Sequence, residues 1–179
     1  DWYLPLIAKK KKSNIIKKKT KKILSSLYKR LNLPNSIFVH RDYHVQNLMK
    51  IRSKIGVIDS QDALIGNPSY DLVSLIDDVR LKTSKKLKQQ IYNYYLKKNM
   101  FSSRKFLEDF NILSVQRNLK IIGIFSRLFK RDKKSQYLKL IPYTWKLLNM
   151  RMKSKMFSEL RNIFDNYIPK NKRAKIINR

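Results

Sequence analysis

The sequence predicts a mainly α-helical fold of the α+β class, with one small β-hairpin between helices. Apolar residues recur at helical spacing along most of the chain, and three short apolar stretches have the length of strands instead. Of the 179 residues, 42% are hydrophobic, which is enough for a folded core. A chain of this length forms one compact domain or a piece of one. We therefore expect one domain over residues 1–169, followed by a frayed basic tail over residues 170–179.

The first long element is an amphipathic helix over about residues 13–32. Ser13 or Asn14 is expected to cap its beginning, because serine and asparagine side chains accept hydrogen bonds from the first free amides of a helix. Pro34 lies just beyond it and is expected to stop it.

The short apolar stretches come next, at residues 36–39, 47–51 and 55–58. A polar turn at residues 52–54 separates the last two, so these two are predicted to form a β-hairpin. A loop is expected at residues 66–68, which read Gly-Asn-Pro.

Helices are predicted for most of the remaining chain. The first, over residues 70–81, would place Leu72, Leu75, Ile76 and Val79 on one face. Pro142 is expected to break or kink the fourth. The predicted helices cover residues 70–81, 85–98, 103–130, 135–151 and 155–167.

The charge is strongly positive: 42 Lys and Arg against 12 Asp and Glu give +30. Such a charge is typical of proteins that bind nucleic acid. However, lysine outnumbers arginine by 30 to 12, as adenine- and thymine-rich coding alone would produce. The densest lysine runs, at residues 9–12 and 17–22, border an apolar helical pattern, which favours a solvated helix face. Because neither an aromatic strand platform nor a recognition helix is evident, a nucleic-acid partner is disfavoured.

Other functional classes are limited by what the sequence lacks. Without cysteine there is no disulfide, no thiolate zinc site and no thiol nucleophile, whereas sites with oxygen ligands for hard cations remain open. No apolar run approaches the roughly 18 to 20 residues that span a bilayer, and the chain opens without a signal segment. We expect a cytoplasmic protein with no membrane partner. Because the chain does not begin with Met, residue 1 is not expected to be its natural start.

The segment His-Arg-Asp-Tyr-His-Val-Gln-Asn at residues 40–47, followed by Asp59 after the predicted hairpin, carries the chemistry. Phosphoryl transfer needs a carboxylate to accept the proton of the attacking hydroxyl, and oxygen ligands that hold Mg²⁺ against the nucleotide phosphates. Asp42 suits the first role. Asn47 and Asp59 suit the second, because the hairpin would bring both toward one metal ion.

This segment resembles the kinase-like phosphotransferases, the superfamily of aminoglycoside phosphotransferases and choline kinases. With Ile-Asp-Ser-Gln-Asp-Ala at 58–63, Tyr-Asp-Leu-Val-Ser-Leu at 70–75 and Gln-Arg-Asn-Leu-Lys-Ile-Ile-Gly-Ile-Phe at 116–125, the chain is similar to the bacterial anomeric N-acetylmuramate/N-acetylglucosamine kinases. The resemblance implies the C-terminal lobe of a protein-kinase-like fold. It also implies ATP- and Mg²⁺-dependent phosphorylation of an amino sugar at its C1 hydroxyl, in cell-wall recycling.

Two departures from that family stand out. Ser60 follows Asp59 where the family commonly has an aromatic residue. The chain also has only three glycines, so no Gly-rich phosphate loop can be assembled from it. We expect the nucleotide-binding lobe to precede Asp1, and we expect the fragment alone to be inactive or nearly so, since positioning of the phosphates supplies much of the catalysis.

Further candidates surround the motif. His40 and Asp71 are expected to support the catalytic loop by hydrogen bonds rather than to react. His44, Gln61 and Asp62 are candidates for substrate binding, although an ordinary polar loop explains the last two equally well.

Candidates elsewhere in the chain are also expected to be structural. Arg117 is a candidate for substrate binding, and a surface salt bridge is the simpler explanation. Trp2, Tyr3 and Trp145 are expected in the core rather than in a wall that stacks on a sugar.

The scarcity of acids also bears on the substrate. Kinases for cationic aminoglycosides or choline need acidic pockets, so a neutral or anionic sugar fits better, and N-acetylmuramate carries a carboxylate that an Arg or Lys could pair with. Two alternatives remain open: another small-molecule kinase of the aminoglycoside, choline or homoserine type, and a non-enzymatic nucleic-acid-binding protein.

Overall fold

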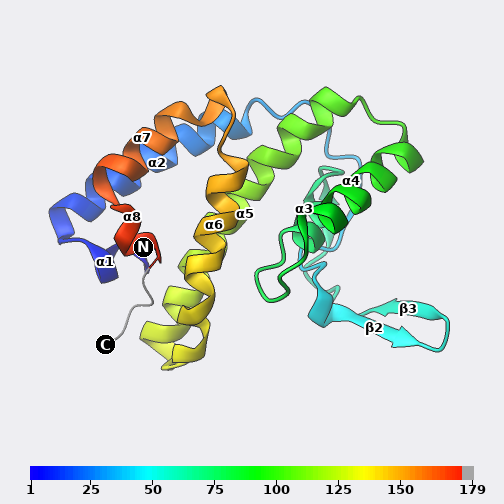
Figure 1. Cartoon of the computed structure of the whole chain (residues 1–179), viewed down its shortest axis with the longest axis horizontal. Coiled ribbons are helices and arrows are strands. Elements are labelled where there is room, and N and C mark those ends of the chain that lie inside the picture. The colour runs from blue at the N-terminus through cyan, green and yellow to red at the C-terminus, as the bar shows by residue number, and fades with distance from the viewer. Residues whose placement is uncertain (175–179) are drawn as a thin grey trace. The chain divides into compact units, whose positions relative to one another are not determined.

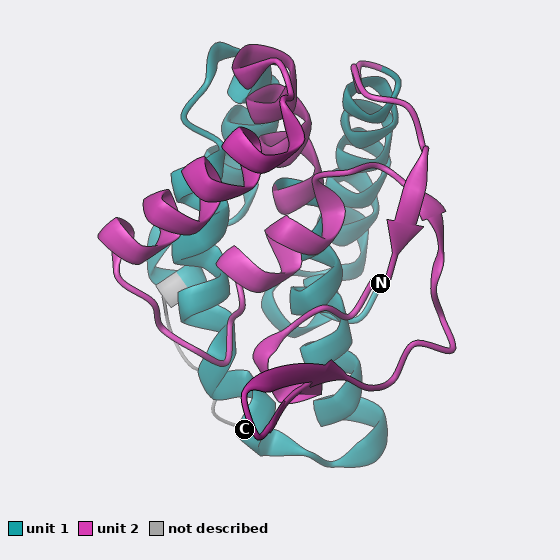
Figure 2. Cartoon of the chain, turned by 90° about the vertical axis from the view of Figure 1, so that its right-hand side faces the viewer, with its two compact units in different colours: residues 1–29, 115–179 teal, residues 30–114 magenta. Residues whose placement is uncertain are grey.

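A computed structural model describes residues 1–174, and the chain divides into two compact units. Unit 1 comprises residues 1–29 and 115–179, and unit 2 comprises residues 30–114 (Figure 2). The predicted fold class is confirmed, because helices dominate and the strands are few and short. The domain boundary expected at residue 169 stays a prediction.

Unit 1 is built from helices. In Figure 1, α2 and α7 of this unit run side by side. Its elements are α1 (Leu4–Ile7), α2 (Lys10–Tyr28), the C-terminal part of α5 (Ser103–Asp132), the 3₁₀ helix η2 (Ser135–Leu140), α6 (Ile141–Arg151), the 3₁₀ helix η3 (Lys155–Phe157), α7 (Ser158–Tyr167) and α8 (Lys170–Ala174).

Unit 2 holds every strand that the structure describes. Figure 1 shows its β2–β3 hairpin projecting from the rest of the unit. The elements are β1 (Ile37–Val39), the 3₁₀ helix η1 (Val45–Asn47), β2 (Leu48–Ile51), β3 (Lys54–Val57), β4 (Leu64–Gly66), α3 (Tyr70–Ile76), α4 (Lys85–Asn99) and the start of α5.

Helix α2 lies earlier in the chain than the sequence predicted. It begins at Lys10, and neither Ser13 nor Asn14 caps it: the Ser13 hydroxyl instead donates to the carbonyl of Ala8 from inside the helix. The helix ends at Tyr28 rather than at residue 32. Further on, the backbone amide of Asn32, where the predicted helix ends, donates elsewhere, to a buried carboxylate of unit 2.

That carboxylate belongs to Asp109, a fully buried residue of α5. One oxygen accepts the backbone N–H of Asn32 at 2.8 Å, and the other accepts the N–H of Leu33 at 2.9 Å. The side-chain amides of Asn32 and Asn67 also donate to it, at 3.0 and 2.8 Å. Asp109 therefore holds the chain that enters unit 2 and the loop that leads into α3.

The predicted hairpin is confirmed. β2 pairs with β3 in antiparallel register, with Leu48 opposite Val57 and Ile51 opposite Lys54. The stretch at 36–39 is also a strand, β1, but its partner β4 falls where the sequence predicted no strand. A three-residue strand carries too little alternation to be recognised by itself, and its partner lies far away along the chain.

Helix α3 is shorter than predicted and ends at Ile76. Beyond it, a carboxylate oxygen of Asp78 accepts the backbone N–H of Arg80 at 2.9 Å. This local hydrogen bond replaces the one that a continuing helix would make. The turn at Asp78 thus ends the helix, although the helical spacing of apolar residues continues to Val79.

The predicted break at Pro142 is confirmed. A 3₁₀ helix precedes it, and α6 begins at Ile141 with the proline in its first turn. Proline fits there because the first amides of a helix have no partner within the helix.

Aromatic and aliphatic side chains form a separate core in each unit. In unit 2, helices α3 and α5 bury Leu72, Val73, Ile76, Phe106, Phe110 and Leu113 against one another. In unit 1, the Trp145 ring meets Phe164 edge-on at 5.3 Å between centroids, and Tyr3 packs beside it. Tyr3 and Trp145 are core residues as predicted, whereas Trp2 is 38% exposed and lies outside the core.

Replacing Tyr3 by phenylalanine is expected to destabilise unit 1. The Trp145 Nε1–H donates to the Tyr3 hydroxyl at 3.0 Å, and both residues are buried, so the variant leaves a buried donor without an acceptor. The expected loss is about 1–3 kcal/mol of unfolding free energy, measured by urea titration of tryptophan fluorescence. The exposed Tyr28 provides the control, and equal stability of the Tyr3→Phe and Tyr28→Phe variants would contradict the expectation.

The predicted frayed tail is wrong for residues 170–174, which form α8. Arg173 anchors this helix: its Nε donates to the carbonyl of Ile168 at 2.7 Å, and its guanidinium lies 5.2 Å from the centre of the Trp145 ring. Residues 175–179 of the predicted tail lie outside the described residues.

Over residues 1–174, none of the helices combines the length and the apolar character that crossing a bilayer requires.

Candidate active site

The loop of residues 40–47 connects β1 to β2 and carries the proposed base, Asp42, half-buried near its start. Arg41, just before it, has φ 73°, a left-handed conformation that residues other than glycine seldom adopt. Such a conformation persists only where neighbouring groups hold it. The contacts that hold this loop therefore matter for where Asp42 lies.

Asp71, in the first turn of α3, supplies the most direct of these contacts. Its two carboxylate oxygens accept the backbone N–H groups of His40 at 2.7 Å and of Arg41 at 3.0 Å. Burial, and then the negative charge of Asp71, raise the pKa of Tyr95, whose hydroxyl donates to the carbonyl of Pro68. The side chain of Asp71 is half-buried, and its two hydrogen bonds hold the backbone at the left-handed Arg41 in place.

His40 ties the same loop to the end of the hairpin. Its Nε2 lies 2.9 Å from the carbonyl oxygen of Ile58, so Nε2 carries the proton and donates. His40 is buried, and Ile58 immediately precedes Asp59. The imidazole thereby fixes the loop that carries Asp42 against the segment that carries Asp59.

Asn47 lies between Asp42 and Asp59. Its amide nitrogen donates to the Asp42 carbonyl at 2.9 Å and lies 3.4 Å from a carboxylate oxygen of Asp59. The Asp42 carbonyl only accepts hydrogen bonds, so the group of the Asn47 side chain that faces it must be the amide nitrogen. This fixes the orientation of the amide, and its oxygen points away from the Asp42 carbonyl. The carbonyl of Asn47 accepts the N–H of Ile58 at 3.1 Å, which closes the base of the hairpin.

The donor set of this cluster suits a hard divalent cation. Asn47 offers an amide oxygen and Asp59 a carboxylate, and Asp59 has φ 70°, a left-handed conformation that residues other than glycine seldom adopt. Magnesium prefers oxygen ligands and usually keeps waters or phosphate oxygens beside one or two protein ligands. No group of three or more histidine and acidic side chains suited to a metal occurs within residues 1–174, so a metal held entirely by such side chains does not fit.

Gln61 and Asp62 follow the hairpin and are exposed. The Gln61 amide donates to Asp59 at 2.7 Å, and the Arg41 guanidinium donates to the backbone carbonyl of Asp62 at 3.1 Å. Both residues thus lie at the rim of the cluster. Their predicted contact with a substrate stays a prediction.

The other two substrate candidates are buried. His44 is 8% exposed, and its backbone N–H donates to the Asp42 carbonyl. Arg117 is 5% exposed and belongs to α5 in unit 1, whereas the cluster belongs to unit 2. Burial makes the surface salt bridge wrong as the explanation of Arg117, and its predicted role in substrate binding stays a prediction.

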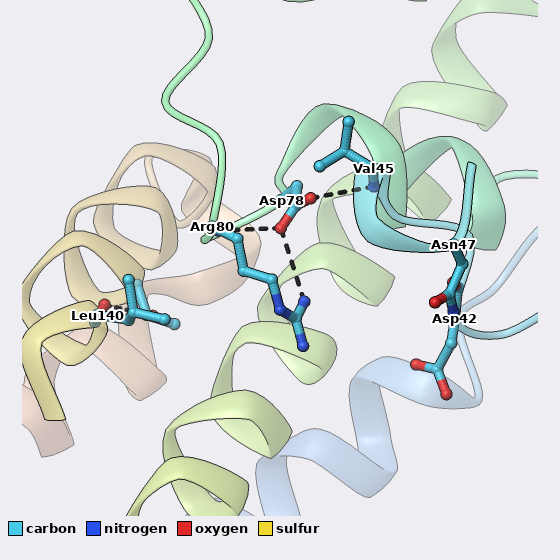
Figure 3. Close-up of polar contacts among 7 residues, drawn as sticks. Asp42, Val45, Asn47, Asp78, Arg80 and Leu140 are labelled. Carbon is cyan, nitrogen blue, oxygen red and sulfur yellow. Dashed lines mark hydrogen bonds and ion pairs between the residues drawn. The ribbon is translucent and has the colours of Figure 1, made fainter. Parts of the chain in front are cut away.

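Two residues that the sequence prediction overlooked adjoin the loop, Asp78 and Arg80. Asp78 is buried, and one of its oxygens accepts the backbone N–H of Val45 at 3.2 Å (Figure 3). Its other oxygen lies 3.7 Å from a guanidinium nitrogen of Arg80. The prediction placed both residues inside a helix. The sequence signal that could have identified them is their spacing, an acid two positions before an arginine at the end of a helix.

Comparison with known proteins places the chain in a family. Residues 18–107 match the phosphotransferase enzyme family. N-acetylmuramate/N-acetylglucosamine kinases are similar in sequence: that of Caulobacter vibrioides is 33% identical over 140 residues, covering 75% of this chain and 39% of the relative. That of Neisseria meningitidis is 38% identical over 136 residues, covering 72% and 40%. That of Pseudomonas aeruginosa is 38% identical over 119 residues, covering 63% and 35%. The chain thus spans two fifths or less of the length of these relatives.

Proposed function

The chain belongs to the phosphotransferase enzyme family, and from that premise we propose that the complete protein transfers the γ-phosphoryl group of ATP to the C1 hydroxyl of an amino sugar. The observation that carries the proposal is the cluster of Asp42, Asn47 and Asp59, which the loop and the hairpin bring into contact. A candidate base beside two oxygen ligands for a cation is the arrangement that phosphoryl transfer needs.

Each residue of the cluster has a proposed role. Asp42 accepts the proton of the sugar hydroxyl and orients that hydroxyl for attack. Asn47 and Asp59 would hold Mg²⁺, which neutralises charge on the ATP phosphates when it is bound. His40 and Asp71 are positioning residues: Asp71 accepts the backbone N–H groups of His40 and Arg41, and the His40 ring ties the loop to the carbonyl of Ile58.

The sugar is proposed from two facts. The relatives are named for N-acetylmuramate and N-acetylglucosamine, and this chain has few acids with which to attract a cationic substrate. The anomeric hydroxyl is also more acidic than other sugar hydroxyls, so a carboxylate base suffices. Recovery of cell-wall sugars in the cytoplasm is the proposed setting.

The test is a substrate panel assayed with the complete gene product that contains this chain. Purified protein is supplied with ATP and Mg²⁺ and with N-acetylmuramate, N-acetylglucosamine, choline, homoserine or an aminoglycoside, and phosphorylated products are identified by mass and NMR. Phosphate at C1 of either amino sugar is the expected result. Turnover of another panel member alone would assign a different small-molecule kinase. No turnover, together with salt-sensitive DNA binding that persists in the Asp42→Ala variant, would favour the non-enzymatic alternative.

A further inference from the structure

We propose that Arg80 forms a carboxylate-binding subsite, through which the site favours an anionic amino sugar over a neutral one. The inference rests on the proposed function and makes it more specific. N-acetylmuramate carries a carboxylate on its lactyl ether, whereas N-acetylglucosamine carries none, so one residue that pairs with this group separates the two sugars.

A buried carboxylate holds Arg80 beside the catalytic loop. Asp78 is 2% exposed, and its two oxygens face different ways: one accepts the N–H of Val45, and the other accepts the Arg80 backbone N–H and faces its guanidinium. Val45 lies between Asp42 and Asn47 in sequence. A single carboxylate therefore separates the guanidinium from the loop that carries the base. In Figure 3 the Arg80 guanidinium and the Asp42 carboxylate both extend toward the lower side of the view.

The guanidinium keeps donors free for a ligand. Arginine has five N–H donors, and the ion pair with Asp78, at 3.7 Å, engages one terminal nitrogen loosely. No second partner for this guanidinium occurs among residues 1–174, and the side chain is 25% exposed. The side chain of Arg80 thus lies beside a buried acid and is a quarter exposed, which leaves donors for two-point binding of a carboxylate.

The phosphates of ATP are the other anions that an arginine near this loop would attract. The residues proposed to hold magnesium against those phosphates are Asn47 and Asp59, and Arg80 contacts neither. Its connection runs instead to Val45, on the loop that presents the base to the sugar. The substrate carboxylate is therefore the favoured partner, and the KM for ATP separates the two possibilities.

The experiment compares sugars in the complete protein carrying Arg80→Gln. The ratio of kcat/KM for N-acetylmuramate to that for N-acetylglucosamine is expected to fall by about 10-fold or more, the size of a lost charged hydrogen bond. Arg80→Lys keeps the charge but not the planar guanidinium, so its ratio of kcat/KM values is expected to lie between those of the unsubstituted protein and Arg80→Gln. N-acetylmuramate methyl ester, which is one methyl group larger and carries no charge, should be used equally well by the unsubstituted protein and by Arg80→Gln.

The matched control is Arg104→Gln, which removes the same charge from an exposed side chain paired with Glu108 on the same helix. It is expected to leave the ratio unchanged. A ratio that is also unchanged in Arg80→Gln overturns the inference. Equal losses on both sugars, or a higher KM for ATP with no change in the ratio, overturn it as well, because they indicate a structural or phosphate-binding role.

Failure of the proposed function is recognised separately. If the unsubstituted protein phosphorylates neither sugar, the subsite is tested by calorimetric binding of N-acetylmuramate and of its methyl ester. Tighter binding of the acid that disappears in Arg80→Gln supports the subsite without the activity. Equal affinity for the acid and the ester overturns it.

Discussion

Asp42→Asn is expected to lower the kcat of the complete protein by on the order of 10²-fold or more, with little change in the KM for ATP. An amide has nearly the size of the carboxylate but cannot accept the proton of the sugar hydroxyl. The contacts that shape the loop around residue 42 use its backbone carbonyl, which receives hydrogen bonds from Asn47 and His44. The substitution therefore removes the base and keeps the loop. Steady-state kinetics with both substrates varied, together with circular dichroism, measure the two effects.

Asp132→Asn makes the same chemical change at a half-buried position of unit 1, where the carboxylate pairs with Arg131 beside it. This variant is expected to keep the parent rate. If Asp42→Asn also keeps it, Asp42 is not the base and the proposed mechanism is wrong.

Asp109→Ala is expected to destabilise the chain by about 3–5 kcal/mol, the largest effect on stability that we predict. Four hydrogen bonds converge on this buried carboxylate, two of them from the backbone of Asn32 and Leu33. Truncation removes the acceptor shared by all four donors, and the buried side-chain amide of Asn67 keeps only the carbonyl of Leu33 as a partner. Urea unfolding followed by circular dichroism measures the loss, and hydrogen exchange is expected to accelerate at the Asn32 and Leu33 amides.

Glu108→Ala is the neighbouring control. Glu108 is half-buried, and its contacts with Asn32 and Arg104 are longer, at 3.3 and 3.5 Å. Pairs of this kind contribute roughly 1 kcal/mol or less. Similar losses from both variants would show that Asp109 has no special role in joining the entry segment to α5.

The candidate cluster could be predicted because its signals are local. Asp42 and Asn47 lie five residues apart in one loop, and a two-stranded hairpin of recognisable composition separates Asn47 from Asp59. The chain reverses at the hairpin, so the two ends of the motif meet whatever the rest of the fold does. Most helices of the second half could be predicted for a similar reason, since apolar spacing within one helix is a local property.

What the sequence did not reveal depends on distant partners. The end of the helix predicted for residues 70–81 was placed too late because Val79 continues the apolar pattern, while the carboxylate of Asp78 binds an amide 33 residues earlier in the chain. The same holds for β4, whose partner is β1, and for Asp109, which binds amides 76 and 77 residues away. Local spacing carries no information about such contacts, so Arg80 was overlooked together with the turn that holds it.

The brace formed by Asp71 has a consequence for the order in which the molecule assembles. Asp71 and His40 are 31 residues apart, and the left-handed Arg41 between β1 and Asp42 needs this contact to persist. We therefore expect the loop of residues 40–47 to acquire its geometry only after α3 has docked, since closure of a long segment must come first. The loop is then expected to form late in folding, and loosening of α3 is expected to release it while the helices are still intact.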